Sequence, residues 1–345
     1  MRFVRRALCA LLAATVLSSS FPALAAKRED TLTRVTRPPE FTAWPRRTQE
    51  GFLASAQMEP QPPFVVNEGE TPGGEKEFVH RDPKNGQYIY LSKDLAVHIR
   101  RFTGWFNRKK IIWYLSDIRF APPQHFRAYL ADPAHARVKG RPAEIALREK
   151  LVYAQNGDLF AFRMENKERA GLIIRNGKVI GEETYTKPVA KIPPLDELSL
   201  YEDGHIEMRT PGLMSAQQYL EAGALDVLAF GPVLLKDGQK DSRLDTSFTH
   251  REPRSAIGVI APGHFVGIMV EGRNKQSAGV PLRFVAERLI EAGCSEAFTL
   301  DGGQTAAMLF MGEYVMSPGV YNGFHKVRRQ QDVIGIGSSQ LVGVP

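Results

Sequence analysis

From about residue 88 onward, apolar and polar positions alternate in short runs that are typical of β-strands. Three of these runs are rich in β-branched and aromatic side chains and are separated by polar turns. Two later runs are separated by Pro262-Gly263, a residue pair that favours a tight turn. The pattern therefore predicts strands at residues 95–102, 111–120, 126–130, 256–260 and 265–271.

Two other segments have the apolar spacing of amphipathic helices. The first is residues 144–154, and the second is residues 280–292. In the second segment, Pro281 suits the first turn of a helix and Gly293 suits the position just after its end. We expect a helix in each segment, with one apolar face toward the core.

Strong turn signals connect strands that are close in the sequence. Asn176-Gly177 separates the apolar runs 171–175 and 178–181 and predicts a hairpin. Lys236-Asp237-Gly238 predicts a second hairpin after the apolar run 227–235. Because strands outnumber helices and often follow one another directly, the chain is predicted to form a mixed α/β (α+β) fold. We expect strand-rich mixed sheets with a few packed helices in a single catalytic domain.

The first 86 residues follow a different pattern. Residues 1–25 have a basic start, an apolar run and the small-x-small sequence Ala23-Leu24-Ala25, which together predict a signal peptide. Residues 36–86 contain 8 prolines and 5 glycines, so residues 26–86 are expected to be an arm or linker. The predicted division is a signal peptide at 1–25, the arm at 26–86 and one domain at 87–345.

The predicted cleavage changes the chemistry of the chain. The 345 residues carry a formal net charge of +7, and loss of three arginines leaves 7 − 3 = +4. Only Cys294 remains, which excludes an intramolecular disulfide and favours a buried packing thiol. No later stretch approaches 18 apolar residues, so we expect a periplasmic or secreted protein without a stable membrane span. A signal that stays attached as an anchor is the alternative.

Several common site motifs are absent from the sequence. It contains no phosphate-binding glycine loop, no nucleophile elbow and no zinc spacing among its histidines. The stretch 98–110 mixes basic and aromatic residues, which is also found in nucleic-acid-binding proteins. Export makes a nucleic-acid partner implausible. An ordinary strand with a basic loop tip, or a patch for anionic glycans or lipids, explains the stretch better.

The segment Leu300-Asp301-Gly302-Gly303-Gln304-Thr305 has the pattern of a ligand site. A carboxylate follows a short strand at 298–300, and two glycines allow close approach of a ligand to the backbone. A plain tight turn would have the same pattern. Other polar residues fall at predicted strand ends and could converge there, namely Arg254, Glu271, Arg273 and Asn156-Gly157-Asp158.

These motifs resemble those of the phosphodiester glycosidase family. An animal member of this family uncovers mannose 6-phosphate on lysosomal enzymes, and bacterial members are often labelled exopolysaccharide biosynthesis proteins. Gln304 stands at the family's third glycine, Thr305 keeps the hydroxyl of a serine, and Glu271 stands where Asp is commoner. The matching elements occur in family order between about residues 90 and 337, namely 156–160, 171–177, 230–238, 253–259, 271–273 and 300–305.

The resemblance implies hydrolysis of a sugar-1-phosphodiester between the anomeric carbon and the phosphate oxygen. It implies Asp301 as nucleophile or base, with Glu271 and then Asp158 as further catalytic carboxylates. Arg254 and Arg273, with the amides of Gly302 and Gly303, would bind the phosphate. Thr305 belongs to the substrate site, and Asn156 would hold a sugar hydroxyl or orient Asp301.

Each of these assignments has a structural alternative. Arg254 could pair with Glu252, Glu271 and Arg273 could cap a hairpin, and Asp158 could be a turn residue. Asp301 and Glu271 could hold a divalent cation, but no metal-binding loop is recognisable, so no cofactor is predicted.

Two other functions remain open at this point. One is a non-catalytic envelope protein that binds phosphate-bearing glycans during exopolysaccharide assembly. The other is a phosphodiesterase that cuts the P–O bond on the far side of the phosphate. The expected partner is a phosphate-bearing glycan, not nucleic acid.

Overall fold

A computed structural model describes residues 67–70, 76–92, 94–185, 194–321 and 323–344. The predicted signal peptide and residues 26–66 of the predicted arm lie outside these residues. No helix in the described ranges is long and apolar enough to cross a membrane.

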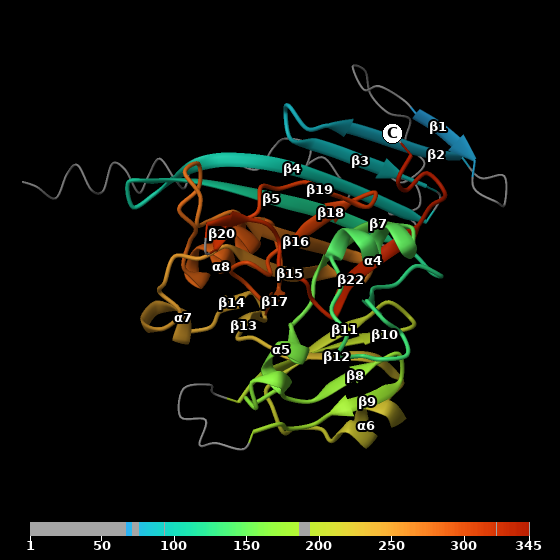
Figure 1. The fold of residues 1–345 in the computed structure, drawn as a ribbon, viewed down its shortest axis with the longest axis vertical. Coiled ribbons are helices and arrows are strands. Elements are labelled where there is room, and N and C mark those ends of the chain that lie inside the picture. The colour runs from blue at the N-terminus through green and yellow to red at the C-terminus, as the bar shows by residue number, and fades with distance from the viewer. Residues whose placement is uncertain (1–66, 71–75, 93, 186–193, 322, 345) are drawn as a thin grey trace, which may run out of the picture. The chain divides into compact units, whose positions relative to one another are not determined.

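A ten-stranded antiparallel sheet dominates the fold (Figure 1). Its strand order is β1-β2-β3-β4-β5-β16-β15-β17-β13-β14, so the N-terminal meander pairs with a C-terminal group through β5 and β16. The bounds are β1 (Asn67–Glu70), β2 (Lys76–Asp82), β3 (Gln87–Leu91), β4 (Leu95–Phe106), β5 (Lys109–Phe120), β13 (Val233–Lys236), β14 (Gln239–Lys240), β15 (Arg254–Ala261), β16 (His264–Val270) and β17 (Glu296–Leu300).

Two five-stranded sheets and one short hairpin complete the described strands. The first sheet has the order β11-β10-β12-β8-β9, and the second has the order β19-β18-β7-β22-β6. The hairpin joins β20 (Val320–Tyr321) and β21 (Phe324–His325). The remaining bounds are β6 (Arg127–Leu130), β7 (Leu151–Asn156), β8 (Ile173–Arg175), β9 (Lys178–Gly181), β10 (Asp196–Tyr201), β11 (Ile206–Arg209), β12 (Ala224–Phe230), β18 (Met308–Phe310), β19 (Glu313–Tyr314) and β22 (Asp332–Ser338).

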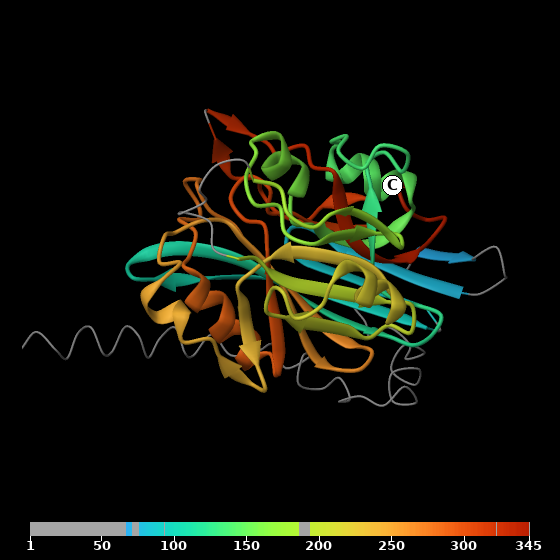
Figure 2. The ribbon, with the colours of Figure 1, turned by 90° about the horizontal axis from the view of Figure 1, so that it is seen from below.

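Five helices are described, and all of them are short. They are α4 (Pro142–Arg148), α5 (Phe160–Glu165), α6 (Ala216–Glu221), α7 (Arg243–Thr246) and α8 (Leu282–Glu291). The longest, α8, packs on one face of the large sheet, where Phe284 meets the rings of Phe106 and Trp113 edge-on at 5.5 and 5.6 Å. The opposite face of that sheet packs on the β7 sheet, as the view in Figure 2 also shows.

The main core lies between these sheets and combines aliphatic side chains with a group of packed aromatic rings. Phe126 packs against Phe265 at 5.5 Å and against Tyr153 at 6.4 Å between ring centres. Leu198 and Leu228 of the β10–β12 sheet belong to the same apolar cluster. The predicted mixed, strand-rich fold is therefore confirmed.

The predicted helix at 144–154 is partly wrong. Helix α4 ends before Lys150, whose φ of +55° breaks the helical path, and the next six residues form the central strand β7. The large sheet also begins before the boundary expected at residue 87, because β2 pairs with β3 and buries Val79. Both predicted hairpins are present, with left-handed Asn176-Gly177 and Asp237-Gly238 turns. Cys294 is buried, as expected.

Candidate functional site

Three neighbouring strands bring several predicted residues to one end of the large sheet. Strand β15 lies between β16 and β17, with Arg254 opposite Val270 and Ser255 opposite Leu300. Asp301 and Glu271 are the next residues after β17 and β16. The strand ends that precede Glu271 and Asp301 are therefore separated by two strand spacings, or about 10 Å.

The backbone of Asp301 is fixed by the end of strand β7. Its N–H donates to the carbonyl of Gly157 at 3.2 Å, and its carbonyl accepts from Nδ2 of Asn156 at 2.8 Å. The Oδ1 of Asn156 accepts from the Ala307 N–H at 3.0 Å. Asn156 therefore holds the backbone of Asp301 in place, and its predicted role at the substrate site stays a prediction.

The two glycines after Asp301 are required by close packing. A Cβ on Gly302 would lie 2.8 Å from the carbonyl oxygen of Pro253, and Gly303 has a φ of +61°. The Gly302 N–H donates to Oδ1 of Asp301 at 2.8 Å, and the Gly303 N–H donates to the Pro253 carbonyl at 2.9 Å. Both amides that were expected to bind phosphate thus have acceptors within the chain.

Asp301 lines a cavity of about 330 Å³. Three arginines, Arg163, Arg243 and Arg328, share its wall with Asp301, and the charges of Arg163 and Arg328 act on its carboxyl group. The guanidinium of Arg328 lies over the Phe162 ring at 5.1 Å, which holds this charge on an aromatic surface. The other lining residues are Leu159, Glu168, Pro194, Leu195, Asp196, Phe230, Gly231, Pro232 and Phe248.

Arg163 is the most buried cation of this cavity. Its terminal nitrogens donate to the carbonyls of Asp158, Ala170 and Ala229. Its Nε is buried without a hydrogen-bond partner among the described residues. Burial lowers the pKa of Arg163, and the nearby carboxylate of Asp158, 3.7 Å away, opposes that change. The guanidinium is therefore held in place by three backbone carbonyls.

The carboxyl group of Asp301 has an unusual acidity. Removal from water raises its pKa to about 6, although the Thr305 hydroxyl and the charges of Arg163 and Arg328 act in the opposite direction. A carboxyl group with a pKa near 6 changes protonation within the range of acid–base catalysis. Thr305 itself is buried beside the loop, and Gln304 is half-buried.

Glu271 lies in a different environment from Asp301. Its Oε1 accepts from the Ser317 N–H at 2.9 Å and from the Tyr114 hydroxyl at 3.3 Å. Its Oε2 accepts from Asn274 at 3.4 Å. Burial raises the pKa of Glu271. These contacts tie two loops to β5, and Glu271 does not line the cavity of Asp301.

Arg254 and Arg273 lie on the other side of the glycine turn. Arg254 donates to the carbonyls of Val280 at 3.1 Å and His250 at 2.8 Å, and burial lowers its pKa to about 10. Arg273 pairs with Glu252 at 2.5 Å, and its guanidinium lies 3.3 Å from where a Cβ on Gly303 would be. Neither arginine lines the cavity.

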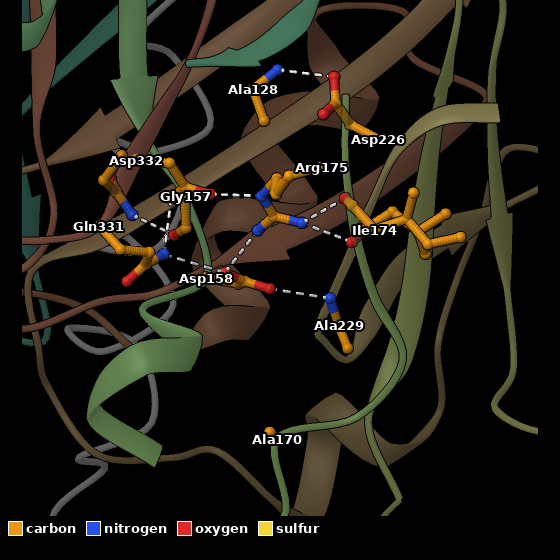
Figure 3. A network of polar contacts seen from close by, with 12 residues as sticks. Ala128, Gly157, Asp158, Ala170, Ile174, Arg175, Asp226, Ala229, Gln331 and Asp332 are labelled. Carbon is orange, nitrogen blue, oxygen red and sulfur yellow. Dashed lines mark hydrogen bonds and ion pairs between the residues drawn. The ribbon is translucent and has the colours of Figure 1, made fainter. Parts of the chain in front are cut away.

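Asp158 belongs to a fully buried polar network (Figure 3). Its Oδ1 accepts from Arg175 at 2.9 Å, and its Oδ2 accepts from the Ala229 N–H at 3.0 Å. Arg175 also pairs with Asp332 at 2.5 Å, and Gln331 bridges Asp158 and Asp332. The network joins β7, β8, β12 and β22 behind the Asp301 loop.

The comparisons with known proteins identify the family of this chain. The sequence model of the NAGPA phosphodiester glycosidase family matches residues 149–336, more than half of the chain. The chain belongs to the phosphodiester glycosidase family. Asp301, its cavity and the Arg175 network all lie within the residues that match.

Two relatives of this family member can be compared with it. The catalytic domain of zebrafish N-acetylglucosamine-1-phosphodiester α-N-acetylglucosaminidase, in a form auto-inhibited by its pro-peptide, superposes with a TM-score of 0.56. That match covers 71% of this chain and 83% of the zebrafish domain at 18% identity, so the fold is shared. The uncharacterized SPbeta prophage-derived protein YomE of Bacillus subtilis is 28% identical over 177 residues. The match covers 50% of this chain and only 26% of YomE.

Sequence reasoning missed the two arginines beside Asp301. Arg163 and Arg328 lie far from Asp301 in sequence and in no motif, and only the folded chain brings them to the same cavity. The described residues contain no group of three or more His, Cys, Asp and Glu side chains arranged to hold a metal ion.

Proposed function

We propose that this family member is an exported hydrolase that cleaves the glycosidic bond of a sugar-1-phosphodiester in an envelope or extracellular glycan. Water is the second reactant, and the products are a free sugar and a phosphomonoester. The observation that supports this best is Asp301, a carboxyl group with a raised pKa in a cavity that also contains Arg163 and Arg328. A carboxylate beside two cations suits a substrate that develops positive charge on the sugar and releases a phosphate.

The proposed roles follow from the positions of these groups. Arg328 binds the phosphate and stabilises it as it leaves, and the buried guanidinium of Arg163 adds positive charge to the same wall of the cavity. Asp301 acts in its ionised form, either as nucleophile at the anomeric carbon or as base for the attacking water. Because a phosphate is a good leaving group, this chemistry does not depend on a strong general acid. The phenylalanine rings of the cavity exclude water and give the sugar an apolar wall.

The decisive experiment uses residues 26–345 and a panel of sugar-1-phosphodiesters in H₂¹⁸O. Cleavage at the anomeric carbon places ¹⁸O in the released sugar, whereas P–O cleavage places it in the phosphate. Asp301→Asn should lower kcat at least about 1,000-fold, equivalent to about 4 kcal/mol on the barrier. Its melting temperature should stay at or above that of the wild type, because the change removes a poorly solvated charge.

Asp237→Asn is the matched control, because Asp237 lies exposed in a left-handed turn that asparagine also adopts. It should keep full activity. Label in the phosphate would identify a phosphodiesterase instead. Binding of the panel without turnover would favour the non-catalytic alternative. Full activity of Asp301→Asn would remove Asp301 from the mechanism.

A further inference from the structure

The connected ends of β4 and β5 form a hairpin tip that projects beyond α8 in both views (Figures 1 and 2). Asn107 and Arg108 make a two-residue turn with φ values of +45° and +61°. Trp105 lies opposite Lys110 across the hairpin and is 61% exposed, although it is a large apolar side chain. The tip therefore presents an indole beside exposed cations.

The hairpin tip is braced from below. Phe106 is buried against the Phe284 ring of α8, and the Arg251 guanidinium lies over Phe106 at 5.2 Å. Arg251 also donates to the Phe106 carbonyl at 3.0 Å. Because the inner face of the hairpin is packed, Trp105 is presented on a fixed support.

The loop 271–279 connects this tip to the Asp301 loop. Its Glu271 N–H donates to the Ile112 carbonyl at 2.9 Å, and its Ala278 N–H donates to the Lys110 carbonyl at 3.0 Å. The same loop carries Arg273, whose guanidinium lies against Gly303. The loop is therefore hydrogen-bonded to the hairpin, and its Arg273 side chain lies next to Gly303, on the side of the glycine turn away from the cavity.

Both the hairpin tip and this loop are basic. Residues 103–110 contain Arg108, Lys109 and Lys110, and residues 272–279 contain Arg273 and Lys275. The one acid of the hairpin tip and loop 271–279 is Glu271, and it is buried. Arg273 forms an ion pair with Glu252 at 2.5 Å, which is the ion pair found for these five cations among the described residues. A surface of this kind attracts an extended anion more strongly than a single small one.

We propose that the hairpin tip and loop 271–279 form a second binding surface for a polyanionic glycan. This inference rests on the proposed function: the surface holds the polymer while its sugar-phosphate end lies beside Asp301. A polymer with repeated phosphates can contact the separate cations in turn, and the indole provides a flat apolar face for a sugar ring. The tip lies outside the residues matched by the family model, whereas loop 271–279 lies within them.

The first test compares a polymer of phosphate-linked sugars with a short sugar-1-phosphodiester. Lys109→Glu/Lys110→Glu and Trp105→Ala should each raise KM for the polymer at least tenfold, while kcat and the kinetics on the short substrate stay unchanged. The matched control is Lys178→Glu/Lys236→Glu, because both lysines are exposed and flank hairpin turns of the same kind elsewhere. Equal effects on the two substrates, or no effect on either, would overturn the proposal.

A binding experiment keeps this result separate from the proposed activity. Asp301→Asn protein is titrated with the same polymer, with its dephosphorylated form and with vesicles containing anionic phospholipid. The Asp301→Asn protein should bind the phosphorylated polymer more tightly than the dephosphorylated one. Its affinity for the phosphorylated polymer should fall at least tenfold when Lys109→Glu/Lys110→Glu is added, and it should also fall as the salt concentration rises. Binding to vesicles alone would identify a membrane surface and overturn the proposal. Polymer binding that ignores the tip substitutions would also overturn it.

Discussion

Asp158 and Asp301 occupy similar places in the chain but different electrostatic environments. Each follows a core strand and has a glycine neighbour, and each interacts with Arg163. Asp158 is fully buried and accepts hydrogen bonds from Arg175, Gln331 and the Ala229 N–H. Asp301 lies at a cavity wall, where its carboxylate accepts a hydrogen bond from the neighbouring Gly302 N–H and is also stabilised by the Thr305 hydroxyl.

The difference sets a carboxylate that is paired within the fold apart from the carboxylate that we propose to react. Asp158 is compensated by Arg175, whose own pKa is raised because the attraction of Asp332 and Asp158 outweighs the effect of burial. Asp301 has lost water without equivalent compensation, so its pKa rises. Burial alone therefore does not mark a functional residue. An incompletely compensated charge beside a cavity is the stronger indication.

The largest effect that tests this contrast is expected on stability. Asp158→Asn should lower the free energy of unfolding by about 3–5 kcal/mol, because it leaves the buried Arg175 short of one partner. Asp301→Asn should instead raise stability by about 1–3 kcal/mol at pH 7, since its buried charge is removed. Urea unfolding of the two variants and of Asp237→Asn measures the difference.

A milder substitution covers the case in which Asp158→Asn does not fold. Gln331→Leu removes the hydrogen bonds to Asp158 and Asp332 and should cost about 1–3 kcal/mol. If both Asp158→Asn and Gln331→Leu left stability unchanged, the network would not be structural and Asp158 would return as a catalytic candidate.

Asp158 and Asp301 also show how much of the site could be predicted from the sequence. Local chemistry fixed the hairpin turns, since Asn176-Gly177 and Asp237-Gly238 adopt left-handed conformations in almost any context. It could not separate Asp158 from Asp301, because each is a carboxylate at a strand end beside glycine. Their different roles depend on Arg175, which reaches Asp158 only when β8 packs beside β7 and β22.

The errors in the predicted elements have a similar origin. The apolar period through Leu151 and Val152 is compatible with a helix, but pairing of β7 with both β18 and β22 favours a strand. Asp301 itself was predicted from a motif in the sequence. Its cavity was not, because Arg163 and Arg328 come from other elements and meet Asp301 only through tertiary packing.

The next effect in size concerns the cations of the cavity. Arg328→Gln should lower kcat/KM about 10- to 150-fold, equivalent to about 1.5–3 kcal/mol for a lost hydrogen bond to a charged group. Arg329→Gln is the matched control, because Arg329 is exposed, donates to the Lys139 carbonyl and does not line the cavity. Steady-state kinetics on one sugar-1-phosphodiester compares them. Equal losses in both variants would show that general surface charge, not the cavity, binds the substrate.

The smallest expected effect is the dependence of rate on pH, and it tests which form of Asp301 reacts. Its pKa of about 6 means that an ionised nucleophile or base becomes scarce below that pH. The kcat/KM of the wild type should therefore fall about tenfold per unit below pH 6 and level off above pH 7. A fall in rate above pH 6 would instead assign Asp301 as a general acid.

Stability provides an independent measurement of the same proton. The folded-state pKa of Asp301 is raised above its ordinary value of 3.8, so the folded protein binds the proton more tightly than the unfolded chain. The stability of the wild type should therefore approach that of Asp301→Asn as the pH falls from 6 toward 4, and the advantage of the variant should be complete only above pH 6. Unfolding curves of both proteins at pH 4.5, 6 and 7.5 measure that gap. A gap that stays constant across this range would mean that the Asp301 carboxylate is as well compensated as that of Asp158.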